Sequence, residues 1–159
     1  MTTRPEKIVS GGQTGVDRAA LDAAKELGIE TGGWVPEGRR AEDGKIPEEY
    51  TTLVECDSAN YATRTALNVR DSDGTMIISR GELTGGSLLT FQIAERHGRP
   101  VLHVDVGSNS LDEAADSVEE WLAGFECRVL NVAGPRASGD PEIYEITREL
   151  LTRAFSAAG

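Results

Sequence analysis

The feature that most constrains the fold of this chain is a repeated alternation between short apolar runs and longer amphipathic stretches. The apolar runs are continuous, which is typical of strands buried on both faces of a parallel sheet. Five such strands are predicted, at residues 7–10, 31–35, 75–79, 101–106 and 128–132. Helices are predicted at residues 16–27, 61–69, 86–97, 111–122 and 141–155. The pattern therefore predicts an α/β fold, with helices on both faces of a mainly parallel sheet of about five strands.

The composition argues against several classes of protein. A membrane span is indicated by an apolar run of about 18 residues or more, and the sequence contains none. Its first residues also lack the apolar stretch of a signal peptide. The net charge of −11 argues against non-specific binding to nucleic acid. Cys56 and Cys127 are isolated in the sequence, which indicates reduced thiols buried as small apolar groups. We therefore expect a single cytoplasmic domain over residues 1–159 that binds neither membranes nor nucleic acid.

A first glycine-rich segment follows the first predicted strand and opens the first helix. Its candidate ligand-binding residues are Gly11, Gly12, Gln13, Thr14, Gly15 and Arg18. Glycine lets the backbone approach a ligand closely, and the free N–H groups of a helix start favour an anion. The segment is neither a Walker A loop nor a full dinucleotide fingerprint. The alternative is a tight turn, and a Gly12→Val variant should separate the two by abolishing binding while the fold stays near intact.

Glycine-containing segments with polar side chains also follow two other predicted strands. The second candidate segment contains Thr84, Gly85, Gly86, Ser87 and Thr90, and the third contains Gly134 and Arg136. Because the carboxyl ends of parallel strands share one edge of a sheet, these loops can converge on one pocket. Helix capping is the alternative for the hydroxyls of Thr84 and Ser87.

Arginines near the predicted loops are the expected charge partners of an anion. The planar guanidinium group binds phosphate or carboxylate through two parallel hydrogen bonds. The candidates are Arg18, Arg64, Arg70 and Arg136, with Arg39 and Arg40 behind them. Surface ion pairing is the alternative, which an acidic protein also favours. Asp17 is expected to complement the helix dipole, and Arg18 to pair with Asp17 or reach the ligand.

Residues 36–50 are predicted to form a long, ordered and charged loop, a kind of segment that usually carries function. Its acidic residues Glu42 and Asp43 are expected to be solvated or to pair with Arg39 and Arg40. Nucleophilic catalysis has little support, because Ser87 does not lie in a Gly-x-Ser-x-Gly elbow. No spacing of His, Cys and carboxylates indicates a metal site. We therefore assign no catalytic residue and no metal ligand.

Taken together, residues 11–18, 33–44, 61–74, 85–90 and 131–136 resemble the "putative molybdenum carrier" family. These proteins are circularly permuted YpsA-type members of the SLOG superfamily of Rossmann-like proteins. The resemblance covers nearly the whole chain and implies a Rossmann-like three-layer sandwich, a ligand pocket at the glycine loops and a homo-oligomer. The family name implies binding of the molybdenum cofactor (molybdopterin), a phosphorylated pterin, for storage or transfer. The chain departs from the family pattern at Val35, Glu37 and Ser87.

The same superfamily contains phosphoribohydrolases, which release bases from nucleoside monophosphates with a catalytic glutamate. In this chain Gln92 falls at the position of that glutamate, and an amide cannot act as an acid or base at neutral pH. We therefore favour a binding protein for a small phosphorylated heterocycle, either molybdenum cofactor or a nucleotide-like molecule. A nucleotide-cleaving N-glycosidase and a sensor of a nucleotide-derived signal are the alternatives.

Overall fold

A computed structural model of the chain describes residues 4–156. Its main sheet has six strands in the order β5-β2-β1-β8-β6-β7, and all neighbouring strands are parallel. They are β1 (Lys7–Val9), β2 (Glu30–Val35), β5 (Leu53–Glu55), β6 (Gly74–Ser79), β7 (Val101–Asp105) and β8 (Val129–Ala133). The helices are α1 (Val16–Glu26), α2 (Tyr61–Arg70), α3 (Gly85–Arg96), α4 (Leu111–Ala123) and α5 (Ile143–Phe155). The predicted α/β fold is confirmed.

The sheet has one strand more than the sequence predicts. The additional strand, β5, lies at the edge of the sheet beside β2, and only Leu53 of its three residues is buried. Residues 36–50 also contain structure that was predicted as a loop: η1 (Glu37–Arg39), and a small antiparallel hairpin formed by β3 (Arg40–Ala41) and β4 (Gly44–Lys45). Short and exposed strands of this kind have no continuous apolar run to mark them.

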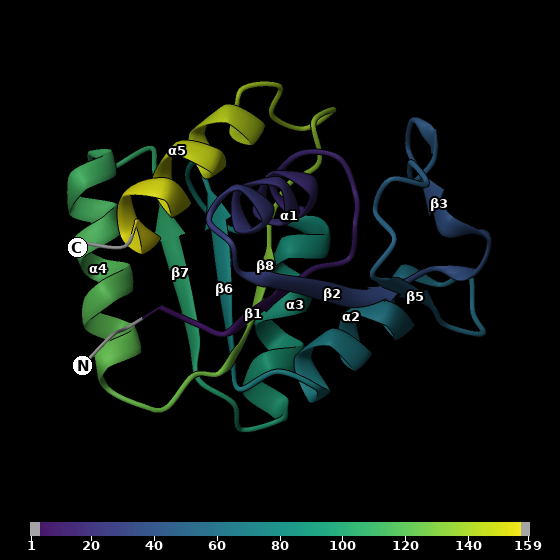
Figure 1. Cartoon of the computed structure of the whole chain (residues 1–159), viewed down its shortest axis with the longest axis horizontal. Coiled ribbons are helices and arrows are strands. Elements are labelled where there is room, and N and C mark those ends of the chain that lie inside the picture. Colours follow the sequence, from purple (N-terminus) through teal and green to yellow (C-terminus); the bar gives the residue numbers. More distant parts are fainter. Residues whose placement is uncertain (1–3, 157–159) are drawn as a thin grey trace.

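Helices cover both faces of the sheet, as Figure 1 shows. The three helices α1, α4 and α5 pack together on one face, and α2 and α3 pack together on the other. Ala20, Ala23 and Ala24 of α1 are buried in the larger core cluster, which also contains Phe155 of α5. The buried residues of α3 are Thr90, Ile93 and Ala94, and Leu88 of this helix is 39% exposed. No helix within residues 4–156 is long and apolar enough to cross a membrane.

The path of the chain creates a topological switch in the middle of the sheet. From β1 the chain passes through α1 to β2 on one side, and from β6 it passes through α3 to β7 on the other side. Strand β8 lies between β1 and β6. The connections at the carboxyl ends of β1 and β6 therefore diverge, which is the arrangement that leaves a binding crevice in open α/β sheets.

The first and last described segments of the chain lie in contact. The Nη1 atom of Arg4 donates a hydrogen bond to the backbone oxygen of Phe155 (3.1 Å). A second nitrogen of the same guanidinium group donates to the backbone oxygen of Leu27. One arginine side chain thus connects the start of the chain with the ends of α1 and α5.

Candidate functional site

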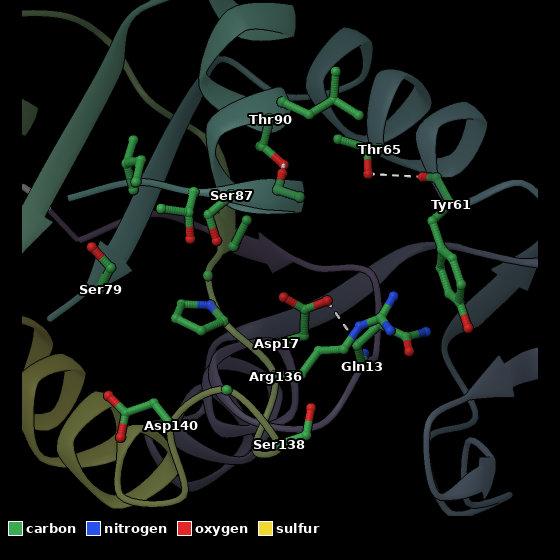
Figure 2. Close-up of a pocket in the computed structure, with 18 of the residues that line it drawn as sticks. Gln13, Asp17, Tyr61, Thr65, Ser79, Ser87, Thr90, Arg136, Ser138 and Asp140 are labelled. Carbon is green, nitrogen blue, oxygen red and sulfur yellow. Dashed lines mark hydrogen bonds between the residues drawn. The ribbon is translucent and has the colours of Figure 1, made fainter. Parts of the chain in front are cut away.

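A cavity of about 410 Å³ lies at the switch point of the sheet. Its walls come from the start of α1, from α2, from the β6–α3 connection and from the β8–α5 connection. Figure 2 shows Asp17 near the middle of this space, with Ser87 and Thr90 on one side and Arg136 and Ser138 on the other. The volume is at the lower end of the range for small-molecule sites, about 300 to 1,000 Å³.

The glycines of the first loop are needed mainly for packing within the protein. A Cβ atom at Gly11 would lie 1.9 Å from Nη1 of Arg64, and a Cβ atom at Gly15 would lie 2.3 Å from the backbone oxygen of Pro135. Gly12 has a φ of +70°, and a Cβ atom at this position would lie 3.0–3.2 Å from side-chain carbons of Val35, Ile46 and Leu53. The expectation that Gly12→Val would leave the fold near intact is therefore incorrect, because a branched side chain has no room there and strains the backbone.

Several amides of the first loop and the start of α1 are already used inside the protein. The N–H group of Gly12 donates to Oγ of Ser10 (3.3 Å), and that of Gln13 donates to Oδ2 of Asp17 (3.2 Å). The first N–H group of α1, on Val16, donates to the backbone oxygen of Pro135 (3.2 Å). The carboxylate of Asp17 thus occupies a position where an anionic ligand would otherwise meet this loop.

Asp17 is a buried acid, 3% exposed, in an electropositive environment. Burial raises the pKa of its carboxyl group, and the nearby guanidinium groups of Arg64, Arg136 and Arg18 oppose that change only in part. The Nη1 atom of Arg64 lies 3.7 Å from Oδ2 of Asp17. Burial likewise lowers the pKa of Arg64, and Asp17 opposes this shift. The two groups therefore compensate each other's charge at the floor of the cavity.

Two arginines of the cavity keep hydrogen-bond donors free. Nε of Arg64 is buried and has no acceptor among the described residues. The guanidinium group of Arg136 lies over the ring of Tyr61, with its central carbon 4.4 Å from the ring centroid. Within residues 4–156 Arg136 forms no hydrogen bond or ion pair through its side chain, so its N–H groups are available to a ligand. Tyr61 was not assigned a role from the sequence, because an aromatic residue at a helix start has no distinctive pattern.

The second glycine loop has three consecutive free amides at the start of its helix. Thr84 precedes α3 and does not cap it through its side chain. The N–H groups of Gly85, Gly86 and Ser87 have no acceptor in the described part of the chain, and the first helical N–H group with one is that of Leu88 (to Thr84, 3.3 Å). Free N–H groups at a helix start bind anions. Gly86 and Ser87 line the cavity directly.

The third loop contributes Gly134 and Arg136 and is held at the mouth of the cavity by an ion pair. Gly134 has no room for a side chain, since a Cβ atom would lie 2.4 Å from the backbone oxygen of Ile78. Arg80, directly after β6, donates from Nε and Nη2 to Asp140 (2.7 and 2.6 Å). This pair joins the β6–α3 and β8–α5 connections. The position of Arg80 at a predicted strand end was a signal that the sequence analysis did not use for the site.

Several residues expected at the site lie outside the cavity. Arg70, at the end of α2, is exposed and pairs with Asp71 (2.7 Å). Arg18 pairs with Asp43 through two hydrogen bonds of 2.6 and 2.9 Å. Of the two expectations for Glu42 and Asp43, pairing with Arg39 and Arg40 is wrong, whereas both acids are exposed to solvent. The candidate ligand-binding residues that lie outside the cavity lining are Gly11, Gly12, Thr14, Gly15, Arg18, Arg70 and Gly85.

Glu42 and Asp43 instead attach the β3–β4 hairpin to the loops beside the cavity. Oε1 of Glu42 accepts hydrogen bonds from the hydroxyl of Thr14 and from the N–H group of Ser138 (3.2 Å). The guanidinium group of Arg39 cannot reach these acids, because it donates to backbone oxygens within its own loop, including those of Pro47 (2.7 Å) and Tyr50 (3.1 Å). Local hydrogen bonds of Arg39 therefore replace the ion pairs expected from its neighbourhood in the sequence.

Groups for metal binding or for acid–base catalysis are sparse in the described part of the chain. Residues 4–156 contain no cluster of three or more His, Cys, Asp or Glu side chains that could hold a metal ion. Gln92 is exposed on α3 and does not line the cavity. Ser79 lines the cavity, but its hydroxyl donates to the backbone oxygen of Gly81 (2.9 Å) and lies 2.7 Å from Nε2 of His103.

The chain is similar to known proteins both in sequence and in structure. The model of the family described as "Circularly permutated YpsA SLOG family" matches residues 8–155. The solved structure of a "Putative molybdenum carrier protein" from Syntrophus aciditrophicus is 51% identical in sequence and superposes with a TM-score of 0.92, covering 94% of each chain. A search of curated proteins found no match.

Proposed function

Because this chain belongs to the circularly permuted YpsA family of SLOG proteins, we propose that its cavity binds a small phosphorylated heterocycle. The phosphate lies at the start of α3, where the N–H groups of Gly85, Gly86 and Ser87 have no acceptor among the described residues. Arg136 supplies the opposing charge from the β8–α5 connection. This arrangement differs from the sequence-based expectation, which also placed the phosphate on the loop before α1.

The observation that carries the proposal is the presence of free cationic donors in an acidic protein. The chain has a net charge of −11, and many of its arginines are committed to carboxylates on the surface. Arg136 is held against Tyr61 without such a partner in residues 4–156. A buried donor without an acceptor, such as Nε of Arg64, costs free energy, and the convergence of cationic donors with free amides on one cavity is typical of an anion site.

Molybdenum cofactor is the ligand that we favour, with the protein acting as its carrier or store. The similar solved structure is named a molybdenum carrier. The residues fit a phosphorylated pterin, since the α3 amides and Arg136 match its phosphate and the cavity has the size of a small-molecule site. We propose that the protein works in the cytoplasm as a homo-oligomer and needs no metal ligand of its own, because the cofactor itself carries the metal.

Nucleotide cleavage is the second candidate, and one observation favours it. Gln92 lies outside the cavity, but Asp17 provides a carboxylate inside it. A carboxylate near a glycosidic bond can stabilise the positive charge that develops as the base leaves. Release of free base from a nucleoside monophosphate would support this function and contradict a role limited to binding.

Calorimetric titration with isolated molybdopterin, GMP and inorganic phosphate tests the proposed function. An Arg136→Ala variant should bind all three about ten- to a hundred-fold more weakly, because it loses hydrogen bonds between charged groups. Arg128→Ala is the matched control, since it removes an exposed arginine that pairs with Glu6 (3.0 Å) and lies outside the cavity lining. Equal affinities of wild type and Arg136→Ala would contradict the assignment of the phosphate site.

A further inference from the structure

Asp17 has one oxygen that the protein does not use. Oδ2 accepts the hydrogen bond from Gln13 and faces Arg64, whereas Oδ1 has no donor in residues 4–156. Figure 2 shows this second oxygen turned away from Gln13, toward the open space of the cavity. A second acceptor nearby is also unused: Oε1 of Gln13 is buried and has no donor among the described residues. The cavity therefore presents acceptors as well as the cationic donors described above.

These acceptors cannot be the phosphate site. A carboxylate repels a phosphate, and an amide oxygen cannot donate to one. The phosphate and the group that meets Asp17 must therefore be different parts of the ligand. The inference rests on the proposed function and concerns the other end of the same molecule.

We propose that Asp17 recognises the 2-amino-4-oxopyrimidine edge that guanine and pterins share. In that edge an amino group and the adjacent ring N–H group point in the same direction, so one can donate to the free Oδ1 of Asp17 and the other to the second lone pair of Oδ2. The neighbouring carbonyl oxygen of the edge needs a donor, which Arg64 supplies from a guanidinium group 3.7 Å from the Asp17 carboxylate.

Other ring systems match this set of groups less well. Adenine has an acceptor nitrogen where the ring N–H group is required, and so places a lone pair against the carboxylate. Hypoxanthine has the ring N–H group but lacks the amino group, and so loses one of two donors. Xanthine has an oxygen in place of the amino group, which the carboxylate repels. Burial has removed water from Asp17 and raises its pKa, so N–H donors of a ligand restore hydrogen bonds that the carboxylate has lost.

Titration of four nucleoside monophosphates (GMP, IMP, AMP and XMP) tests this assignment. Wild-type protein should bind GMP at least about ten-fold more tightly than IMP, because one hydrogen bond to a charged group is lost, and should bind AMP and XMP more weakly still. Asp17→Asn keeps the acceptor for Gln13 but turns an amino group toward the ligand. This variant should lose the preference for GMP and prefer XMP, whose 2-oxo group accepts from the new amide.

A matched variant separates recognition from general effects of charge. Asp140→Asn also removes a carboxylate from the cavity lining, but both oxygens of Asp140 accept from Arg80. It should change the affinities for the four nucleotides by the same factor. Thermal unfolding of each variant shows whether it is folded, and the wild-type ratio of GMP to IMP affinity tests the inference even if Asp17→Asn does not fold.

The possible results are distinct. Equal wild-type affinities for GMP and IMP would overturn the role of Asp17 and leave the phosphate site standing. The same would follow if Asp17→Asn weakened all four nucleotides alike. Binding of inorganic phosphate without binding of any nucleotide would overturn the recognition of this edge. If neither phosphate nor any nucleotide binds, the proposed function fails, and this inference fails with it.

Discussion

Gly11 and Gly15 belong to one loop, yet their neighbours give them different roles. The space beside Gly11 is filled by the guanidinium group of Arg64, the mobile end of a long side chain. The space beside Gly15 is filled by the backbone of Pro135 and Arg136, and Gly15 has a φ of +81°. A side chain at Gly11 would therefore displace a cavity arginine, whereas one at Gly15 would displace a connection of the fold.

We predict that Gly11→Ala and Gly15→Ala affect different properties of the protein. Gly11→Ala should weaken GMP binding about ten-fold because it displaces Arg64, the proposed donor to the base edge, and should change the free energy of unfolding by less than about 1 kcal/mol. Gly15→Ala should destabilise the protein by about 2 kcal/mol or more, because its backbone conformation is strained for any other residue. Urea unfolding and GMP titration measure the two effects. Equal losses of stability would contradict the distinction.

Individual site residues could be predicted from the sequence only where a local pattern marks them. Arg136 and Ser87 follow predicted strands and do line the cavity. The place of the Asp17 carboxylate in the cavity could not be predicted, because its charge is compensated by Arg64, which is far away in the sequence. The ion pair between Arg18 and Asp43 likewise depends on the position of the β3–β4 hairpin beside α1. Contacts between distant segments leave no periodicity in the sequence.

The β3–β4 hairpin is an element attached to the site mainly by ionised side chains. Asp43 pairs with Arg18 of α1, and Glu42 accepts from the loops after β1 and β8. These hydrogen bonds lower the pKa of both acids, with the bonds to Ser138 and Arg18 as the respective leading causes. A lowered pKa in the folded state means that the stabilisation is complete above the unfolded-state pKa and is lost as the pH falls through the folded-state value.

We therefore expect the hairpin to loosen at acidic pH before the sheet unfolds. Amide NMR signals of Ala41 and Gly44 should shift as the pH falls below about 4, while signals of β6 remain unchanged. At neutral pH Asp43→Asn should speed hydrogen exchange in residues 37–46 several-fold, because it removes the ion pair with Arg18. Glu48→Gln, an exposed change in the same loop, is the control. Unchanged exchange in Asp43→Asn would show that apolar contacts hold the hairpin.

Elements differ in how clearly the sequence marks them. All six residues of β6 are buried, and their continuous apolar run predicts the strand with nearly the observed bounds. In β5 Val54 is 53% exposed, so the strand exists because β2 offers a free edge, not because its side chains form a buried run. Sequence periodicity thus predicts the strands that carry a continuous apolar run, including the edge strand β7, and misses the exposed edge strand β5.

At the scale of the whole molecule, the order of the strands in the sheet brings together three connections from different parts of the chain. The cavity needs β8, the last strand in sequence, between β1 and β6. The sequence predicts that loops at strand ends converge, because all parallel strands end on one edge. It does not predict the order of the strands, since that order depends on packing between α1 and α5 and between α2 and α3.

The hydrogen bond between Arg4 and the backbone of Phe155 has a consequence for chain connectivity. Where the two ends of a compact fold touch, a short peptide can bridge them and a new opening can be made in an exposed turn. Residues 97–100, between α3 and β7, are all exposed, and none of them lines the cavity. A rearranged chain that starts at Arg99 and ends at Gly98 should unfold cooperatively and keep its affinity for phosphate. Circular dichroism measures the cooperativity of unfolding, and calorimetric titration measures the affinity for phosphate. If both are kept, the order of the strands in the sheet does not depend on where the chain begins.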